Sequence, residues 1–199
     1  HAVVLAHGAG ADMHATALTS VAGALAGANV PSLRFNFPYM SAGKRAPDRA
    51  PVLAAAVREA AGELARRTKL PPERIVLGGR SMGGRYCSLA AGDAADPLPV
   101  LGLVLLGYPL HPPGRADRLR VEHFPRLRVP TMFVSGTRDA FGTPAELQQA
   151  ARRLKGPVTW HWIDTADHGF TPLKSSGLTK AAALEAAAAA VVEFVTALG

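Results

Sequence analysis

Short runs of consecutive apolar residues alternate along the chain with longer stretches of helical periodicity. The apolar runs predict strands at residues 2–6, 30–35, 74–77, 100–106, 131–134 and 158–163. The stretches between and after them predict helices at residues 13–28, 48–68, 81–91, 146–154 and 180–198, the first capped by Asp12. Strands that are apolar throughout are covered on both faces. The pattern therefore predicts an α/β fold with a mostly parallel sheet of about six strands and helices on both faces.

The 199 residues are most simply one domain, spanning residues 1–199. The two least regular stretches, residues 38–51 and 107–129, are too short for an inserted lid domain. The alanine-rich stretch at residues 180–198 contains Glu185 and Glu193, and its large apolar residues share one helical face. We therefore expect a packed amphipathic helix there and no membrane-spanning segment.

The composition is that of a globular protein, with 48% hydrophobic and 19% charged residues. The net charge of +7 would suit nucleic acid, but the densest basic stretch, residues 115–128, is interrupted by Asp117 and Glu122. That stretch also lacks the interleaved aromatic residues of single-strand binders and any zinc-ligand spacing. We therefore expect an arginine-rich surface with no nucleic-acid or membrane partner. The single cysteine excludes an internal disulfide and fits a reducing compartment, so we expect a cytoplasmic protein.

The stretch GGRSMGG at residues 78–84 lies between a predicted strand and a predicted helix. It contains the pattern G-x-S-x-G, in which a sharp turn holds a serine in a strained backbone conformation. Glycines on either side prevent clashes with the neighbouring strand and helix. The turn would expose Ser81 Oγ and leave the Met82 N–H at a helix N-terminus, pointing at the group that Ser81 attacks. The alternative is a glycine-rich turn with a helix-capping serine; the flanking strand and helix favour the nucleophile.

A serine nucleophile needs a general base, and the base needs an acid to orient it. Of the seven histidines, His168 directly follows the last strand, at the sheet edge where Ser81 is expected. Asp139 follows the fifth strand, while Asp164 and Asp167 are alternatives close to His168 in sequence. The order serine, acid, histidine across successive strand ends favours Asp139.

The first strand ends in HGAG at residues 7–10, where small residues let a backbone N–H approach a substrate oxygen. Ala9, with Gly10 beside it, is the candidate for the second oxyanion donor after Met82. His7 has no acidic or cysteine partner at ligand spacing, so we expect a structural histidine and no metal.

Arg80, beside the nucleophile, and Tyr39, after the second strand, are the candidates for substrate contact. Arg34 and Arg85 are expected to brace the turn through hydrogen bonds instead.

Taken together, HGAG, GRSMG, GTRD and DHGF span residues 7–170 in an order that resembles the α/β-hydrolase superfamily. LAHGAGADM, RFNFPYM at residues 34–40 and GTRDAFGTP are more narrowly similar to a small lidless, dienelactone-hydrolase-like branch. That branch also resembles a domain in a subunit of a chromatin acetyltransferase complex. The resemblance implies a triad of Ser81, His168 and Asp139, a backbone oxyanion hole at Ala9 and Met82, and neither metal nor organic cofactor.

One departure concerns the nucleophile, because dienelactone hydrolases use a cysteine where this chain has Ser81. Cys87 lies six residues further on and is expected to be buried. We therefore expect a serine hydrolase that acts on an ester or thioester of a small acyl substrate through an acyl-enzyme. The alternative is a non-catalytic binding or scaffold module that retains the fold. Ester, thioester and amide hydrolysis, acyl transfer and the oligomeric state all remain open.

Overall fold

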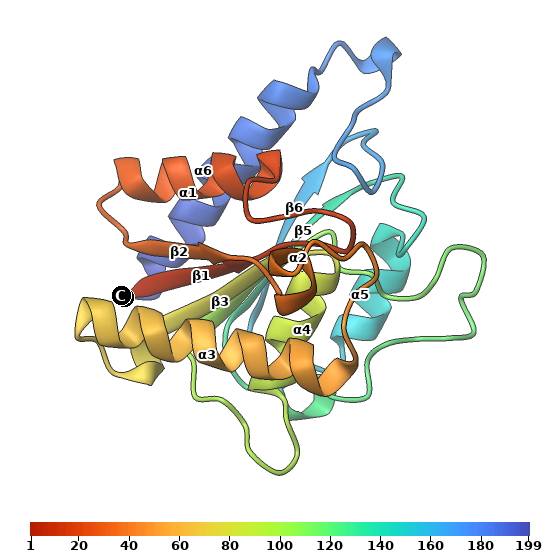
Figure 1. Ribbon diagram of the computed structural model, residues 1–199. Helices are drawn as coiled ribbons and strands as arrows, with labels where there is room; N and C mark the ends of the chain where they lie inside the picture. The colour runs from red at the N-terminus through yellow and green to blue at the C-terminus, as the bar shows by residue number, and fades with distance from the viewer.

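A computed structural model describes residues 1–199 and contains one sheet of six parallel strands (Figure 1). The strands are β1 (Ala2–Ala6), β2 (Ser32–Phe35), β3 (Ile75–Arg80), β4 (Gly102–Leu106), β5 (Thr131–Gly136) and β6 (Val158–Ile163). Their order across the sheet is β2-β1-β3-β4-β5-β6, and each neighbouring pair is parallel. The predicted α/β architecture is confirmed.

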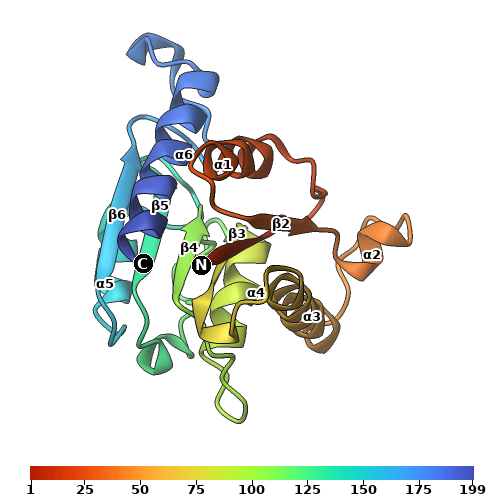
Figure 2. The ribbon, with the colours of Figure 1, turned by 90° about the vertical axis from the view of Figure 1, so that its left-hand side faces the viewer.

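Helices cover both faces of the sheet (Figure 2). Two of them, α1 (Thr16–Gly27) and α6 (Lys180–Ala197), lie on one face, while α3 (Ala50–Thr68), α4 (Met82–Ala91) and α5 (Pro144–Ala151) lie on the other. A short helix α2 (Pro38–Ser41) follows β2, and 3₁₀ turns occur at Pro72–Arg74, Phe124–Arg126 and Lys174–Ser176. Successive strand residues point to opposite faces. Leu77 therefore packs in the core with α3, α4 and α5, whereas Val76 packs in the core with α1 and α6.

The C-terminal helix α6 packs as its sequence predicts. Leu184, Val191 and Val195 are buried in one core cluster with residues of α1. No helix is both long enough and apolar enough to cross a membrane.

Several element boundaries differ from the prediction. β3 and β5 continue beyond their apolar runs, through Gly78 and Gly79 to Arg80 and through Ser135 to Gly136. Glycines suggest a turn in the sequence, yet Gly78 and Gly79 stay extended because both pair with β1 and β4. A Cβ on Gly78 would lie 3.1 Å from Leu5 Cδ2, so the packing there favours glycine. β2 and β4 each begin two residues later than predicted.

The helix starts also differ. The prediction that Asp12 caps the first helix is wrong, because its carboxylate accepts the His14 N–H in a preceding turn and the N-cap is Ala15. α5 begins two residues earlier than predicted because Thr143 and Glu146 form a capping box at its start.

The strand order places a crevice at the carboxyl ends of β1 and β3. β2 lies on one side of β1 and β3 on the other, so the connections from this region run in opposite directions. Ligands of open parallel sheets bind where the strand order reverses in this way. The loops that follow β1 and β3 are therefore positioned to form a site.

Candidate active site

Ser81 forms the junction between β3 and α4. Its backbone has φ 49° and ψ −113°, a conformation that non-glycine residues seldom adopt. The Ser81 N–H donates to Leu106 O (2.9 Å), and the Ser81 carbonyl accepts the Arg85 N–H (3.0 Å). These bonds to β4 and α4 hold the strained turn and fix where Ser81 stands at the sheet edge.

The glycines around Ser81 are required by close backbone contacts. A Cβ on Gly79 would lie 2.5 Å from Gly84 N, and one on Gly83 would lie 2.6 Å from the carbonyl oxygen of His7. In both cases the obstacle is main chain, which cannot move aside as a flexible side chain would. The predicted reason for these glycines therefore agrees with the packing.

We expect Gly83→Ala to destabilise the protein by about 3 kcal/mol, the upper part of the range for overpacking, because the new methyl group meets backbone on β1. Gly62→Ala in α3 is the matched control, since a Cβ there meets nothing within 4 Å. That control is expected to stabilise by up to about 1 kcal/mol through helix propensity. Urea unfolding measures both, and equal stabilities for the two variants would contradict this reading of the turn.

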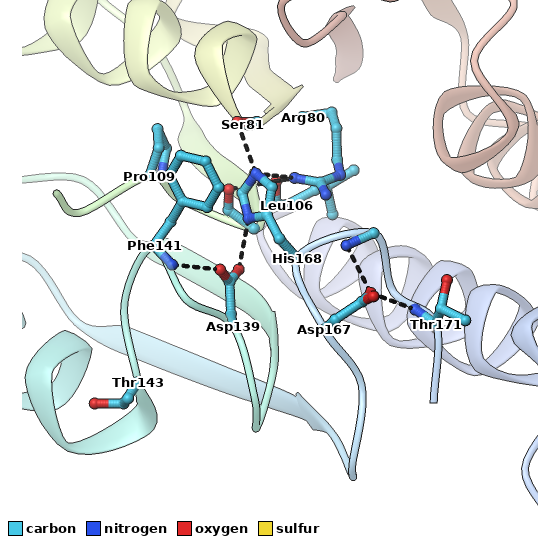
Figure 3. A network of polar contacts seen from close by, with 12 residues as sticks. Arg80, Ser81, Leu106, Pro109, Asp139, Phe141, Thr143, Asp167, His168 and Thr171 are labelled. Carbon is cyan, nitrogen blue, oxygen red and sulfur yellow. Dashed lines mark hydrogen bonds and ion pairs between the residues drawn. The ribbon is translucent and has the colours of Figure 1, made fainter. Parts of the chain in front are cut away.

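The structure brings Ser81, His168 and Asp139 into one hydrogen-bonded chain (Figure 3). Ser81 Oγ is 3.0 Å from His168 Nε2, and His168 Nδ1 is 2.7 Å from Asp139 Oδ2. Asp139 is 1% exposed, and its Oδ1 accepts the Phe141 N–H at 2.8 Å. The Phe141 ring stacks on the imidazole with a centroid separation of 4.1 Å. The carboxylate favours a proton on Nδ1, which leaves Nε2 free to accept the serine proton.

The two alternative aspartates do not contact the imidazole. Asp167 Oδ1 accepts the N–H groups of Gly169 (2.8 Å) and Thr171 (3.0 Å), so it shapes the turn that carries His168 (Figure 3). Asp164 Oδ1 accepts a hydrogen bond from Thr137 Oγ1 at 3.4 Å. Of the three candidate acids, only Asp139 meets His168.

Two of the three candidate oxyanion donors border the same cavity as Ser81. Met82 is the first residue of α4, where a backbone N–H has no acceptor within the helix. Ala9 follows β1 and lines the cavity, and its N–H donates no backbone hydrogen bond. Gly10, the third candidate, is exposed in a turn with φ +72° and does not line the cavity. The arrangement leaves Ala9 and Met82 as the pair beside Ser81.

Arg80 packs inward and does not line the cavity, contrary to its expected role in substrate contact. Its Nη1 donates to Leu106 O (3.3 Å) and Gly107 O (3.4 Å) and lies 3.4 Å from His168 Nε2 (Figure 3). Its Cζ stands 4.6 Å from the centroid of the Phe170 ring, and burial lowers its pKa to about 10. Gly107 makes room for the guanidinium, because a Cβ there would lie 3.0 Å from Arg80 Cζ. Arg80 therefore supports His168 and the ends of the strands.

Tyr39 is also placed away from the cavity. The chain after β2 turns into α2, which carries the ring inward, where it is 1% exposed and packs against Phe37 and His7. His7 Nδ1 donates to Gly8 O (2.8 Å), and its Nε2 accepts the Phe37 N–H (3.1 Å). Burial lowers the pKa of His7, so it remains neutral and braces the loop after β1, as expected. Arg34 donates to Met13 O at 2.8 Å, so it braces the segment between β1 and α1 and not the turn at Ser81, where it was expected to act.

The cavity beside Ser81 has a volume of about 450 Å³ and is open to solvent. Its lining comprises Ala9, Pro47, Asp48, Leu53, Ser81, Met82, Arg85, Tyr86, Pro109, Arg120, Phe141 and His168. Sequence reasoning missed Asp48, Arg120 and Phe141. Phe141 could have been found, since it follows Asp139 by two residues. Arg120 lies in an irregular stretch, and Asp48 lies where an irregular stretch meets the helix predicted over residues 48–68, so no motif marks either. A slightly larger hollow of about 500 Å³ around residues 91–100 and 125–129 contains none of the predicted site residues.

Cys87 takes no part in this cavity. It is fully buried in α4, its thiol donates to Gly78 O at 3.3 Å, and burial raises its pKa. No group of three or more His, Cys, Asp or Glu side chains is arranged so that it could hold a metal ion.

A buried histidine that contacts α4 gives a pH prediction. His123 Nε2 lies 2.8 Å from Ser88 Oγ, and burial, then repulsion from Arg85 and Arg126, lowers its pKa to about 4. Between pH 6.5 and 4 the unfolded chain binds this proton and the native protein does not. As the pH is lowered from 6.5 to 4, the free energy of unfolding is therefore expected to decrease by about 3 kcal/mol from His123 alone.

Denaturant unfolding at pH 7 and pH 4 measures this loss. His123→Gln is expected to reduce it, whereas the same change at the exposed His14 is expected to leave it as in the parent. An equal loss in the parent and in His123→Gln would contradict the assignment.

Comparisons with known proteins agree with this architecture. A sequence model for a family described as an alpha/beta hydrolase domain matches residues 1–196. A dienelactone hydrolase from Anabaena variabilis superposes with a TM-score of 0.72 at 21% identity, covering 98% of this chain and 86% of that chain. Est1E from Butyrivibrio proteoclasticus, with ferulic acid bound, superposes with a TM-score of 0.76 at 16% identity, covering 99% of this chain and 89% of that chain. A monoacylglycerol lipase from Paleococcus ferrophilus superposes with a TM-score of 0.75 at 17% identity, covering 99% of this chain and 94% of that chain. The chain thus has a lidless fold like that of dienelactone hydrolase, while the resemblance to a chromatin-complex domain stays a prediction.

Proposed function

This chain belongs to the alpha/beta hydrolase domain family, and we propose that it is a serine hydrolase that cleaves an ester or thioester of a small acyl substrate. The observation that carries the proposal is the hydrogen-bonded chain from Ser81 through His168 to Asp139. It stands at the end of a strained strand-to-helix turn, beside an open cavity. A nucleophile, a base and an orienting acid in this order are the parts that acyl transfer requires.

In the acylation step, Ser81 Oγ attacks the carbonyl carbon while His168 Nε2 takes the serine proton. The carbonyl oxygen becomes an oxyanion, to which the Ala9 and Met82 N–H groups donate hydrogen bonds. The tetrahedral adduct then collapses, the bond to the alcohol or thiol breaks, and the leaving group takes the proton from Nε2. The acyl group is left as an ester on Ser81.

In the deacylation step, a water molecule attacks the Ser81 ester and His168 Nε2 takes a proton from that water. The second tetrahedral adduct collapses, the bond to Oγ breaks, and Oγ recovers its proton from Nε2. The products are the carboxylic acid and free enzyme. Asp139 accepts the Nδ1–H throughout and stabilises the imidazolium that forms in each step. The Phe141 N–H holds the other carboxylate oxygen and so fixes the acid in place.

The shape of the cavity favours small or exposed acyl groups. No lid domain covers it, and its volume of about 450 Å³ is at the small end of ligand pockets. The named activities of the structural neighbours, esterase, lipase and dienelactone hydrolase, support ester chemistry on this fold.

A fluorophosphonate probe tests the proposal directly, because it phosphonylates only serines that an adjacent base has activated. We expect intact mass spectrometry to show one adduct on the folded protein, and peptide mapping to locate it on Ser81. Urea-unfolded protein is the control and should remain unlabelled. Folded protein that forms no adduct would overturn the proposal and favour a binding module that retains the fold.

A further inference from the structure

The cavity beside Ser81 contains two guanidinium groups without a carboxylate partner. Arg85 and Arg120 both line it, and neither takes part in any ion pair within 4.0 Å. Arg85 Nε is buried and has no hydrogen-bond partner. The only side-chain hydrogen bond of Arg120 is a long one, from Nη1 to Pro109 O at 3.5 Å. Both side chains therefore retain donors for a ligand.

These two arginines differ from the structural arginines of the same protein. Arg34 donates to a backbone carbonyl at 2.8 Å, and Arg126 Nε donates to Gly92 O at 2.6 Å. Arg85 has no such bond, and its guanidinium lies over the Tyr86 ring, 5.6 Å from Cζ to the centroid. The bracing role expected for Arg85 from the sequence therefore has no hydrogen bond to support it.

The two guanidiniums come from separate, well-held segments. Arg85 lies one helical turn after Ser81, and residues four apart in a helix share a face, with side chains leaning toward the N-terminus. Arg120 is fixed through its backbone, since its N–H donates to Leu110 O (2.8 Å) and its carbonyl accepts the Tyr108 hydroxyl (2.6 Å). A ligand that bridges both arginines would thus lie next to the nucleophile.

The charge in the cavity is unbalanced. Burial, followed by repulsion from Arg85, lowers the pKa of Arg120. The only acidic residue in the lining is Asp48, which forms no ion pair, and its Oδ2 is buried without a hydrogen-bond partner. Two guanidiniums against one carboxylate leave an excess positive charge, which an anionic ligand would offset.

We propose that Arg85 and Arg120 bind an anionic group, a carboxylate or a phosphate, carried by the substrate near its scissile carbonyl. The planar fork of a guanidinium matches both groups through paired charge-assisted hydrogen bonds. This proposal rests on the proposed hydrolase function and names a class of substrate for it: esters or thioesters with an anionic substituent. The anionic group belongs either to the acyl part or to the leaving group, and the experiment separates the two.

The kinetic test compares matched anionic and neutral esters. The acyl pair is 4-nitrophenyl hemiglutarate and 4-nitrophenyl pentanoate, and the leaving-group pair is 3-carboxy-4-nitrophenyl acetate and 4-nitrophenyl acetate. We expect the anionic member of one pair to have the higher kcat/KM. Arg85→Gln and Arg120→Gln are each expected to lower the anionic-to-neutral ratio about tenfold or more, because each removes charge-assisted donors. The pair that responds identifies which part of the substrate carries the anion.

Two further variants control for charge and position. Arg118→Gln removes the same charge from an exposed residue in the same loop as Arg120, and it is expected to leave the ratio as in the parent. Asp48→Asn removes the opposing charge from the cavity and is expected to raise the ratio. The proposal is wrong if Arg85→Gln and Arg120→Gln lower kcat/KM equally for the anionic and the neutral ester of each pair. It is also wrong if Arg118→Gln lowers the anionic-to-neutral ratio as much as Arg120→Gln does.

A binding measurement separates this proposal from the hydrolase function. Calorimetry with glutarate is expected to show binding to the parent and to Arg118→Gln, and weaker binding to Arg85→Gln and Arg120→Gln. A cooperative thermal unfolding transition for each variant, measured first, shows that the variant is folded. The parent protein could hydrolyse the neutral esters, show no preference for an anionic ester and fail to bind glutarate. That outcome would overturn the anionic site alone. Glutarate binding that depends on both arginines, in protein that hydrolyses none of the esters, would support the site and contradict the hydrolase.

Discussion

Ser81→Ala is expected to lower kcat for 4-nitrophenyl acetate by about six orders of magnitude. The substitution removes the only atom that can form the acyl-enzyme, and His168 is left without a hydroxyl to activate. The residual rate would come from the oxyanion donors and the cavity acting on a water molecule. Steady-state kinetics with purified variant, together with the loss of fluorophosphonate labelling, measures the effect.

The control for this variant is Ser41→Ala, an exposed serine in α2 that is not among the cavity-lining residues. It should retain the activity of the parent. If Ser81→Ala keeps one per cent or more of the parent kcat, the nucleophile is another group and the proposed mechanism is wrong.

Asp139→Asn is expected to lower kcat by about four orders of magnitude with little change in KM. An asparagine has the shape of the aspartate, and its Oδ1 can still accept the Phe141 N–H. Its amide group, however, donates to His168 Nδ1 where the carboxylate accepted from it. That reversal moves the imidazole proton to Nε2, which can then no longer take the proton from Ser81.

Asp167→Asn is the matched control, because this residue also lies close to His168 in sequence. Its Oδ1 accepts two backbone N–H groups, and an asparagine oxygen can accept the same bonds. The variant should lose less than tenfold in kcat. If it lost as much as Asp139→Asn, Asp139 would no longer be identified as the orienting acid.

The meeting of Ser81, His168 and Asp139 could be predicted because each residue follows a strand of a parallel sheet. Strand ends of one polarity converge at one edge, so the order of elements alone brings distant residues together. The same reasoning made Ala9 a candidate, since it too follows a strand, and the pairing of β1 with β3 in the structure brings the two strand ends together. The continuous apolar runs predicted parallel strands but not their order across the sheet, which the structure shows to be β2-β1-β3-β4-β5-β6.

The direction of long side chains could not be predicted in this way. Arg80 is adjacent to Ser81 in sequence, yet the space left by Gly107 allows its guanidinium to turn inward onto the Phe170 ring. Tyr39 turns inward because the segment that follows β2 forms the short helix α2, which no hydrophobic periodicity indicated. Arg120 reaches the cavity from an irregular segment whose path depends on hydrogen bonds to Leu110 and from Tyr108. Each of these outcomes depends on tertiary contacts.

The open cavity also has a kinetic consequence. Where a lid covers a site, its opening or the release of product limits many turnover numbers. Here the cavity beside Ser81 is open to solvent, so dissolved monomeric substrate is expected to reach the serine without a preceding conformational step. The rate with an ester of limited solubility should therefore follow the monomer concentration and level off at the critical micelle concentration, with no interfacial activation when aggregates form.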